Sequence, residues 1–252
     1  MAQKDSRIYS RVDKSSLSSP HRAVSTHIKL EWDIDFDKQT LTGFAEHCVD
    51  ILVDGVDSAD FDSSATLEVQ HVVVEGKEGS FELSDNHPVL GRKISVSFPP
   101  MDKGSSLTIR FYYSVDNTAS ALQWLAPSAT KGGQHPYLFS QSQAIHARSL
   151  LPCMDSPGVK TPYTAVVTAP KWCTVLLSAL QSTQKITNEK EGKNTFVWIQ
   201  PVPIPAYLIA LAAGNLRFQV ISFPFQLLMQ PQSYLVKSRL RISNSSHQLT
   251  HS

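Results

Sequence analysis

Apolar and polar residues alternate strictly in the first regular segment of the chain, residues 27–36. The even positions there are all apolar, and charged residues fill most of the odd ones. A two-residue period directs one side of an extended strand into a core and the other side into water, which a helical stripe of period 3.6 does not do. The pattern predicts a strand over 27–36, a turn over 37–39 and a returning strand over 40–53.

The same alternation recurs along the chain, with turn-forming residues between the segments. Further strands are predicted at 67–73, 94–98, 107–115, 163–169 and 196–198. Turns are expected at Asp54-Gly55, Glu75-Gly76 and Pro99-Pro100. The apolar run 205–214 is consistent with a buried strand. Short strands at this spacing predict an all-β fold, either a mostly antiparallel β-sandwich or a curved, saddle-like double sheet.

Composition and charge exclude several classes of partner. Apolar residues make up 41% of the chain and charged residues 18%, which fits a soluble globular protein with a substantial core. The net charge of +1 gives no attraction to nucleic acid, and no run of roughly 18 apolar residues predicts a membrane span. We therefore expect neither a nucleic-acid nor a membrane partner.

The cysteines and the two ends of the chain bear on its location. Cys48, Cys153 and Cys173 are an odd number at wide spacing, which fits the reducing cytosol better than a disulfide framework. Residues 1–26 are polar and charged and lack the apolar core of a secretory signal, so a cytoplasmic protein is expected. Residues 217–252 contain no Asp or Glu and are basic and rich in Ser, and we expect this tail to be poorly ordered.

A motif at residues 136–160 carries a specific resemblance. The segment reads PYLFSQSQAIHARSLLPCMDSPGVK. It closely resembles the part of the leukotriene A(4) hydrolase and aminopeptidase B group in which a Tyr-Leu-Phe-Ser-Gln-x-Gln-Ala strand leads into an Arg-x-x-x-Pro-Cys-x-Asp turn. Supporting matches are ALQWL at 121–125 and VPIPAYLIA at 202–210. The three motifs stand in the family's order, and the resemblance extends from about residue 27 to 216.

The resemblance implies a fold and a role. The family's N-terminal domain is a saddle-shaped, mostly antiparallel β-structure, and its Gln-x-Gln-Ala loop forms one wall of the substrate cleft. Carried onto this sequence, the substrate-binding residues are Gln141, Ser142, Gln143 and Ala144, with Ser142 at the variable place of the pattern, and Tyr137 could also reach the cleft. A glutamine amide offers both a donor and an acceptor to a substrate amine or peptide carbonyl. Peptide N-termini or a lipid epoxide are the substrates that the resemblance implies for the full-length family.

The family's catalytic residues have no counterpart in this sequence. Catalysis in the family needs an H-E-x-x-H helix and a more distant Glu around zinc, and none of the nine histidines begins that motif. The Gly-x-Met-Glu-Asn loop of the family is also absent. We therefore expect no catalytic residue, no metal ligand and no cofactor in this chain. The expected organisation is a polar segment 1–26, a β-domain 27–216 and the tail 217–252, as a truncated form without the zinc domain.

Arg148, Cys153 and Asp155 are expected to be structural. An ion pair between Arg148 and Asp155 would fix the turn after the glutamines, and the resemblance makes the Pro-Cys-x-Asp element structural. A Cys153 nucleophile with His146 as its base lacks an orienting third group. A metal site of His135, His146 and Asp155 is a further alternative. Trp32 and Trp198 lie on the apolar phase of strands, which favours core packing over a ligand cage.

Three hypotheses about the function remain open at this point. The leading one is a substrate-recognition β-domain that is not catalytic by itself. The second is a regulatory protein that pairs with a full-length enzyme or with itself, because the face that lacks its partner domain should expose an apolar patch. The third is a truncated product without a function.

Overall fold

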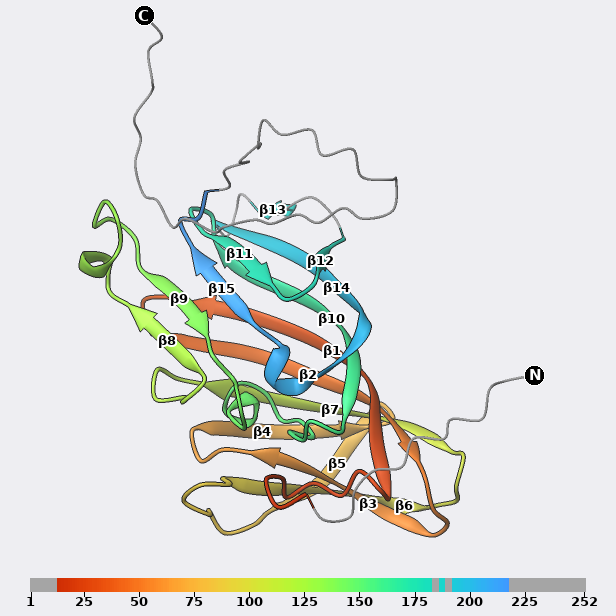
Figure 1. The fold of residues 1–252 in the computed structure, drawn as a ribbon. Helices are drawn as coiled ribbons and strands as arrows, with labels where there is room; N and C mark the ends of the chain where they lie inside the picture. The colour runs from red at the N-terminus through yellow and green to blue at the C-terminus, as the bar shows by residue number, and fades with distance from the viewer. Residues whose placement is uncertain (1–12, 183–185, 189–191, 218–252) are drawn as a thin grey trace, which may run out of the picture.

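The computed structural model describes residues 13–182, 186–188 and 192–217, and they form two β-sheets (Figure 1). The larger sheet has 11 strands in the order β12-β14-β10-β1-β2-β7-β4-β5-β6-β3, with β13 also paired to β14, and the smaller has the order β11-β15-β9-β8. Strands β1 and β10 pair in parallel, and every other strand pair is antiparallel. The described residues contain no α-helix, so the all-β prediction of two mostly antiparallel sheets is confirmed.

The strands of the larger sheet are β1 (Ala23–Asp35), β2 (Thr40–Ile51), β3 (Val56–Ser63), β4 (Leu67–Val74), β5 (Lys77–Leu83), β6 (Arg92–Met101), β7 (Ser106–Val115), β10 (Lys160–Pro170), β12 (Leu180–Gln181), β13 (Ile186–Asn188) and β14 (Lys193–Pro205). Those of the smaller sheet are β8 (Leu122–Leu125), β9 (Tyr137–Ser140), β11 (Thr174–Leu177) and β15 (Leu211–Gly214). Three 3₁₀ turns connect them: η1 (Pro127–Ala129), η2 (Ala147–Ser149) and η3 (Ala206–Leu208).

The alternation in the sequence corresponds to the buried side of the strands. From Ile28 to Ile34 the even residues of β1 are buried, and the Trp32 indole N–H donates to the Tyr113 hydroxyl of β7 at 2.7 Å. The smaller sheet packs over β10, β1 and β2 (Figure 1), and the ring centroids of Phe36 and Trp124 are 5.5 Å apart across this contact. One continuous core therefore joins both sheets, and Trp32 and Trp198 lie in it as expected.

Two local predictions were wrong. Pro99 and Pro100 do not form a turn but lie inside β6, where the register with β3 shifts between Val56 and Ser58. Both prolines are exposed, and an irregular stretch of pairing tolerates residues without an N–H donor. The apolar run 205–214 is not one strand, because η3 interrupts it and only Leu211–Gly214 is extended.

Ordered contacts are present before residue 27, where the predicted β-domain begins. β1 begins at Ala23, and Ser16 and Leu17 already hydrogen-bond to Asp62 of β3. The expectation of a poorly ordered tail falls almost wholly on residues 218–252, which lie outside the described residues. No helix within the described ranges is long and apolar enough to cross a membrane.

Candidate functional site

The glutamine loop, residues 141–146, begins where β9 ends and is held at both ends by backbone hydrogen bonds. The Gln141 N–H donates to the Ala121 carbonyl oxygen at 2.8 Å, which joins the loop to the start of β8. The His146 N–H donates to the Ser142 carbonyl oxygen at 2.9 Å and closes the loop upon itself. The peptide bond between Gln143 and Ala144 is cis. The two backbone hydrogen bonds hold the segment from which the side chains of the loop project.

The candidate binding residues divide into exposed and buried groups. Gln141, Gln143 and Ala144 are exposed, whereas Ser142 is 2% exposed. The Gln141 carboxamide oxygen accepts the Gln143 N–H at 3.1 Å, which orients the Gln141 side chain along the loop. Within the described residues the Gln143 carboxamide has no hydrogen-bond partner, so its donor and acceptor both remain available. Two neighbouring amides can thus bind a polar ligand from the open side of the loop.

Ser142 and Tyr137 lie in the interior rather than on that open side. The Ser142 hydroxyl is buried, and none of the described residues hydrogen-bonds to it. The Tyr137 ring stacks on Phe139 at 5.6 Å between centroids, and burial raises the pKa of its hydroxyl. A Cβ added to Gly214 of β15 would lie 2.8 Å from the Tyr137 ring, so this glycine allows the ring to pack closely. In this structure Tyr137 supports the strand that leads into the glutamine loop.

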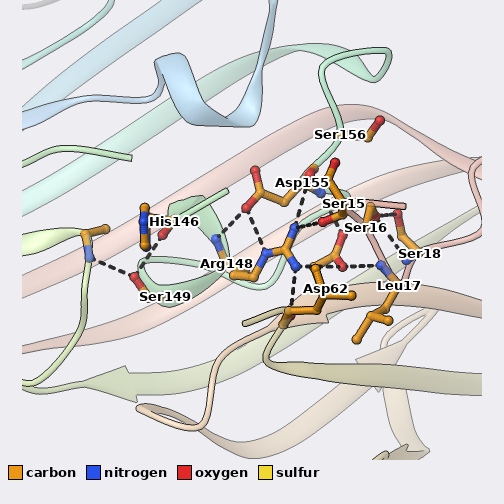
Figure 2. Close-up of polar contacts among 12 residues, drawn as sticks. Ser15, Ser16, Leu17, Ser18, Asp62, His146, Arg148, Ser149, Asp155 and Ser156 are labelled. Carbon is orange, nitrogen blue, oxygen red and sulfur yellow. Dashed lines mark hydrogen bonds and ion pairs between the residues drawn. The ribbon is translucent and has the colours of Figure 1, made fainter. Parts of the chain in front are cut away.

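Arg148, in η2 directly after the loop, forms the centre of a buried polar cluster (Figure 2). Its Nε lies 3.0 Å from the Asp155 carboxylate, so the ion pair expected between them is present. Its Nη1 lies 3.6 Å from the Asp62 carboxylate and donates to the Leu90 carbonyl oxygen at 2.7 Å. Its Nη2 donates to the Ser15 carbonyl oxygen at 2.7 Å. Each of the three guanidinium nitrogens therefore donates a hydrogen bond.

The two carboxylates of the cluster share the single cation. Asp62 and Asp155 are at most 1% exposed, and the Asp155 N–H donates to the Asp62 carboxylate at 2.9 Å. Burial raises the pKa of Asp155; the positive charge of Arg148 opposes this shift, and the negative charge of Asp62 adds to it. The cluster therefore depends on donors from other segments to stabilise its second carboxylate.

Sequence patterns did not identify Asp62 or the residues around Ser15 as members of this cluster. Asp62 lies 93 residues from Asp155, in a strand of mixed polar and apolar residues that alternation did not predict. Ser15 is 133 residues from Arg148. A charged residue inside a strand-like segment, Asp62 in ADFDS, was the only local signal, and by itself it does not name a partner.

The alternative roles for Cys153 and the histidines find little support in the geometry. Cys153 is fully buried, and burial raises the pKa of its thiol well above the usual range, which disfavours the nucleophilic thiolate. The His146 ring accepts or donates at Nδ1 to the Ser120 hydroxyl at 2.8 Å. His135 stacks instead on Trp172, with 4.3 Å between ring centroids. The residues proposed for a nucleophilic or metal site thus have separate partners.

The described residues do not fit a zinc ion. No group of three or more His, Cys, Asp or Glu side chains in ranges 13–182, 186–188 and 192–217 is placed to hold a metal. Asp62 and Asp155, the two buried carboxylates nearest the loop, are engaged by Arg148.

The described strands form a β-domain of two joined sheets, and comparison with known proteins identifies its class. Residues 24–208 match the Peptidase M1 N-terminal domain. Leukotriene A-4 hydrolase of Xenopus laevis is 35% identical over 206 residues, which cover 81% of this chain and 34% of that protein. Leucine aminopeptidase 2 of Saccharomyces cerevisiae is 34% identical over 225 residues, which cover 85% of this chain and 32% of that protein.

Solved structures show the same relationship. The structure of native yeast LTA4 hydrolase superposes on this chain with a TM-score of 0.73 at 32% sequence identity. The superposed region covers 84% of this chain and 32% of the yeast chain. An M1 zinc metallopeptidase from Deinococcus radiodurans, at 19% identity and a TM-score of 0.65, shares the fold. The chain belongs to the peptidase M1 family through its N-terminal domain, and it spans about a third of the length of the curated relatives it matches.

Proposed function

We propose that this chain is the substrate-recognition β-domain of an M1 aminopeptidase of the leukotriene A(4) hydrolase type. The observation that carries the proposal is the exposed pair Gln141 and Gln143 on a loop whose base is buried and held by Arg148. Peptides with a free N-terminus or a lipid epoxide are the proposed ligands, in keeping with the names of the relatives. Gln143 is the first contact, because its carboxamide has both functions available.

Recognition can be tested on the chain itself by NMR titration with a tripeptide that carries a free amino group. One wall of a cleft gives weak binding, so a Kd on the order of 1 mM is expected. The side-chain amide signals of Gln141 and Gln143 should shift, and Gln143→Ala should abolish the effect. Gln134→Ala, an exposed glutamine before β9, is the matched control and should bind as the unmodified chain does. Shifts confined to other regions would contradict the proposal.

We further propose that the chain does not hydrolyse peptides without a zinc domain. The sequence contains no H-E-x-x-H motif, and water activation in this chemistry requires zinc and its neighbouring Glu. The test is aminoacyl-anilide cleavage by the purified chain with added zinc. Activity that co-elutes with the chain in gel filtration and disappears with a chelator would overturn this part of the proposal.

We also propose a cytoplasmic location, which the thiol state of all three cysteines supports.

A second candidate function is pairing with a full-length enzyme or with another copy. It is favoured by exposed apolar side chains on β12, the outer part of β14 and η3, namely Leu180, Ile199, Val202 and Leu208. Leu180 and Val202 are more than half exposed, and apolar surface of this kind marks interaction sites. Sedimentation of the chain with and without the full-length relative tests it: free migration of both at micromolar concentration would exclude the pairing.

A further inference from the structure

The N-terminal strap, residues 13–18, lies across the Arg148 cluster and supplies its missing donors (Figure 2). The Leu17 N–H and the Ser16 hydroxyl both donate to the Asp62 carboxylate, at 2.6 and 2.5 Å. The Ser15 carbonyl oxygen accepts from the Arg148 guanidinium, and Asp13 accepts from the Ser156 hydroxyl. The strap is thus bound through the backbone and through side chains on both sides of the cluster.

The cluster requires the strap because one guanidinium faces two buried carboxylates. Arg148 lies closest to Asp155, at 3.0 Å, and farther from Asp62, at 3.6 Å. Asp62 is therefore stabilised largely by hydrogen-bond donors, and the strap supplies two of them. A buried carboxylate that loses such donors must draw the cation toward itself, admit water or move. Each of these responses displaces Arg148.

Displacement of Arg148 reaches the glutamine loop through η2. The Arg148 backbone N–H donates to Asp155, so the first turn after the loop is fixed by the same carboxylate. The neighbouring Ser149 hydroxyl donates to the His146 carbonyl oxygen at 2.8 Å and accepts the Ala121 N–H at 2.9 Å. Ala121 in turn receives the Gln141 N–H. Hydrogen bonds therefore run from the strap through Arg148 to both ends of the loop.

We propose that the N-terminal strap is a positioning element for the glutamine loop, with Ser16, Asp62 and Arg148 as positioning residues for Gln141 and Gln143. Asp62 and Arg148 are buried, Ser16 is half-buried, and none of the three belongs to the loop itself. Their effect is to hold η2, and through it the backbone from which the two carboxamides project. The consequence for ligand binding rests on the proposed function, whereas the mechanical coupling between strap and loop does not.

The chain offers a closely matched pair of variants for the test. Ser16→Ala removes the hydroxyl that donates to Asp62 and accepts the Ser18 N–H. Ser19→Ala removes a hydroxyl one residue beyond the strap, which donates to Asp60 of the same strand at 2.8 Å. Asp60 belongs to a separate group with Ser95 and Lys93, outside the Arg148 cluster. Ser16→Thr keeps the hydroxyl and serves as the rescue variant.

The measurement is amide hydrogen exchange, resolved by NMR, of the 252-residue chain. Ser16→Ala should accelerate exchange at Gln141 and His146 about tenfold, because the buried Asp62 carboxylate loses the Ser16 donor. Exchange in the β10–β14 pairing, for example at Val166, should stay unchanged. Ser19→Ala should leave the loop unaffected, and Ser16→Thr should restore it.

Two results would overturn the proposal. In one, Ser16→Ala accelerates exchange in the strap alone, which would show that the loop is held independently. In the other, exchange rises equally throughout both sheets, which would assign Ser16 a general role in stability. No ligand is present in this measurement, so its failure is distinguishable from a failure of Gln141 and Gln143 to bind peptide.

Discussion

The His47 ring in β2 donates a hydrogen bond from Nε2 to the carbonyl oxygen of Pro152, 3.0 Å away and 105 residues along the chain. The Ser25 hydroxyl donates to the other ring nitrogen at 2.9 Å, so the neutral imidazole is satisfied on both sides. The ring is fully buried, and this burial lowers its pKa from 6.5 to about 4. His47 thereby joins the central strands to the Pro-Cys-x-Asp turn, and its burial disfavours the charged form of the ring.

Stability is predicted to fall between pH 6.5 and pH 4 because of His47. In this range the unfolded chain binds a proton that the folded chain excludes, so the contribution of His47 is complete above pH 6.5 and is lost as the pH falls toward 4. At about 1.4 kcal/mol per pKa unit, the free energy of unfolding should decrease by about 3 kcal/mol. Urea unfolding across this range measures it. His47→Gln, which cannot titrate, should show a clearly smaller decrease, and identical curves for both proteins would contradict the assignment.

Replacement of Arg148 by Met is predicted to lower the free energy of unfolding by about 3–5 kcal/mol, because Asp62 and Asp155 are left buried without their cation. Arg110→Met is the control. Arg110 pairs with Glu46 on the partly exposed face of the sheet, where such a loss is worth about 1 kcal/mol or less. Denaturant unfolding of both variants measures the two free energies of unfolding. Equal decreases would show that Arg148 does not stabilise the buried carboxylates more than a partly exposed ion pair would.

Ser142→Ala is predicted to stabilise the protein by up to about 1 kcal/mol. The Ser142 hydroxyl is buried without a partner among the described residues, and removing an unsatisfied polar group relieves its desolvation cost. The neighbouring Ser149→Ala should have the opposite sign, since this hydroxyl accepts from Ala121 and donates to His146. Thermal unfolding of the two variants distinguishes them, and destabilisation of comparable size in both would indicate a hidden partner of Ser142.

Gly43→Ala is predicted to cost about 3 kcal/mol or more. Gly43 in β2 has a φ of 150°, and an added Cβ would lie 1.9 Å from the Glu31 carbonyl oxygen of the paired strand β1. Backbone atoms cannot yield to such an overlap without disturbing the sheet. Gly158→Ala meets its nearest atom at 3.8 Å and should change stability by no more than about 0.5 kcal/mol. Chemical unfolding midpoints of both variants provide the check.

The fold was largely predictable because strand alternation is a local property. In β7, and in β1 from Ile28 onward, buried positions alternate with less buried ones at the two-residue period. Strand β3 escaped prediction, since it buries the polar residues Asp62 and Ser63 beside Phe61. These residues of β3 are buried by segments that are distant in the sequence, so the order of apolar and polar residues within β3 does not reveal their burial.

The candidate site was predictable only in part, for a related reason. The motif around Gln141 and Gln143 is contiguous, so a family resemblance locates it, and the Arg148–Asp155 pair is only seven residues apart. Asp62 and the strap come from distant parts of the chain. The sequence contains the donors and acceptors of the cluster but does not state which pairs form.

By itself, the sequence determined the all-β class, the sides of the main strands, the family and the loop that carries the two glutamines. Tertiary structure alone decided that Ser142 is buried, that η3 interrupts the run 205–214, and that residues 13–18 complete the buried cluster at Arg148. The physical reason is that periodicity and motifs encode the environment of each residue along the chain. Hydrogen bonds and ion pairs between distant segments are selected only when folding removes water from all their partners together.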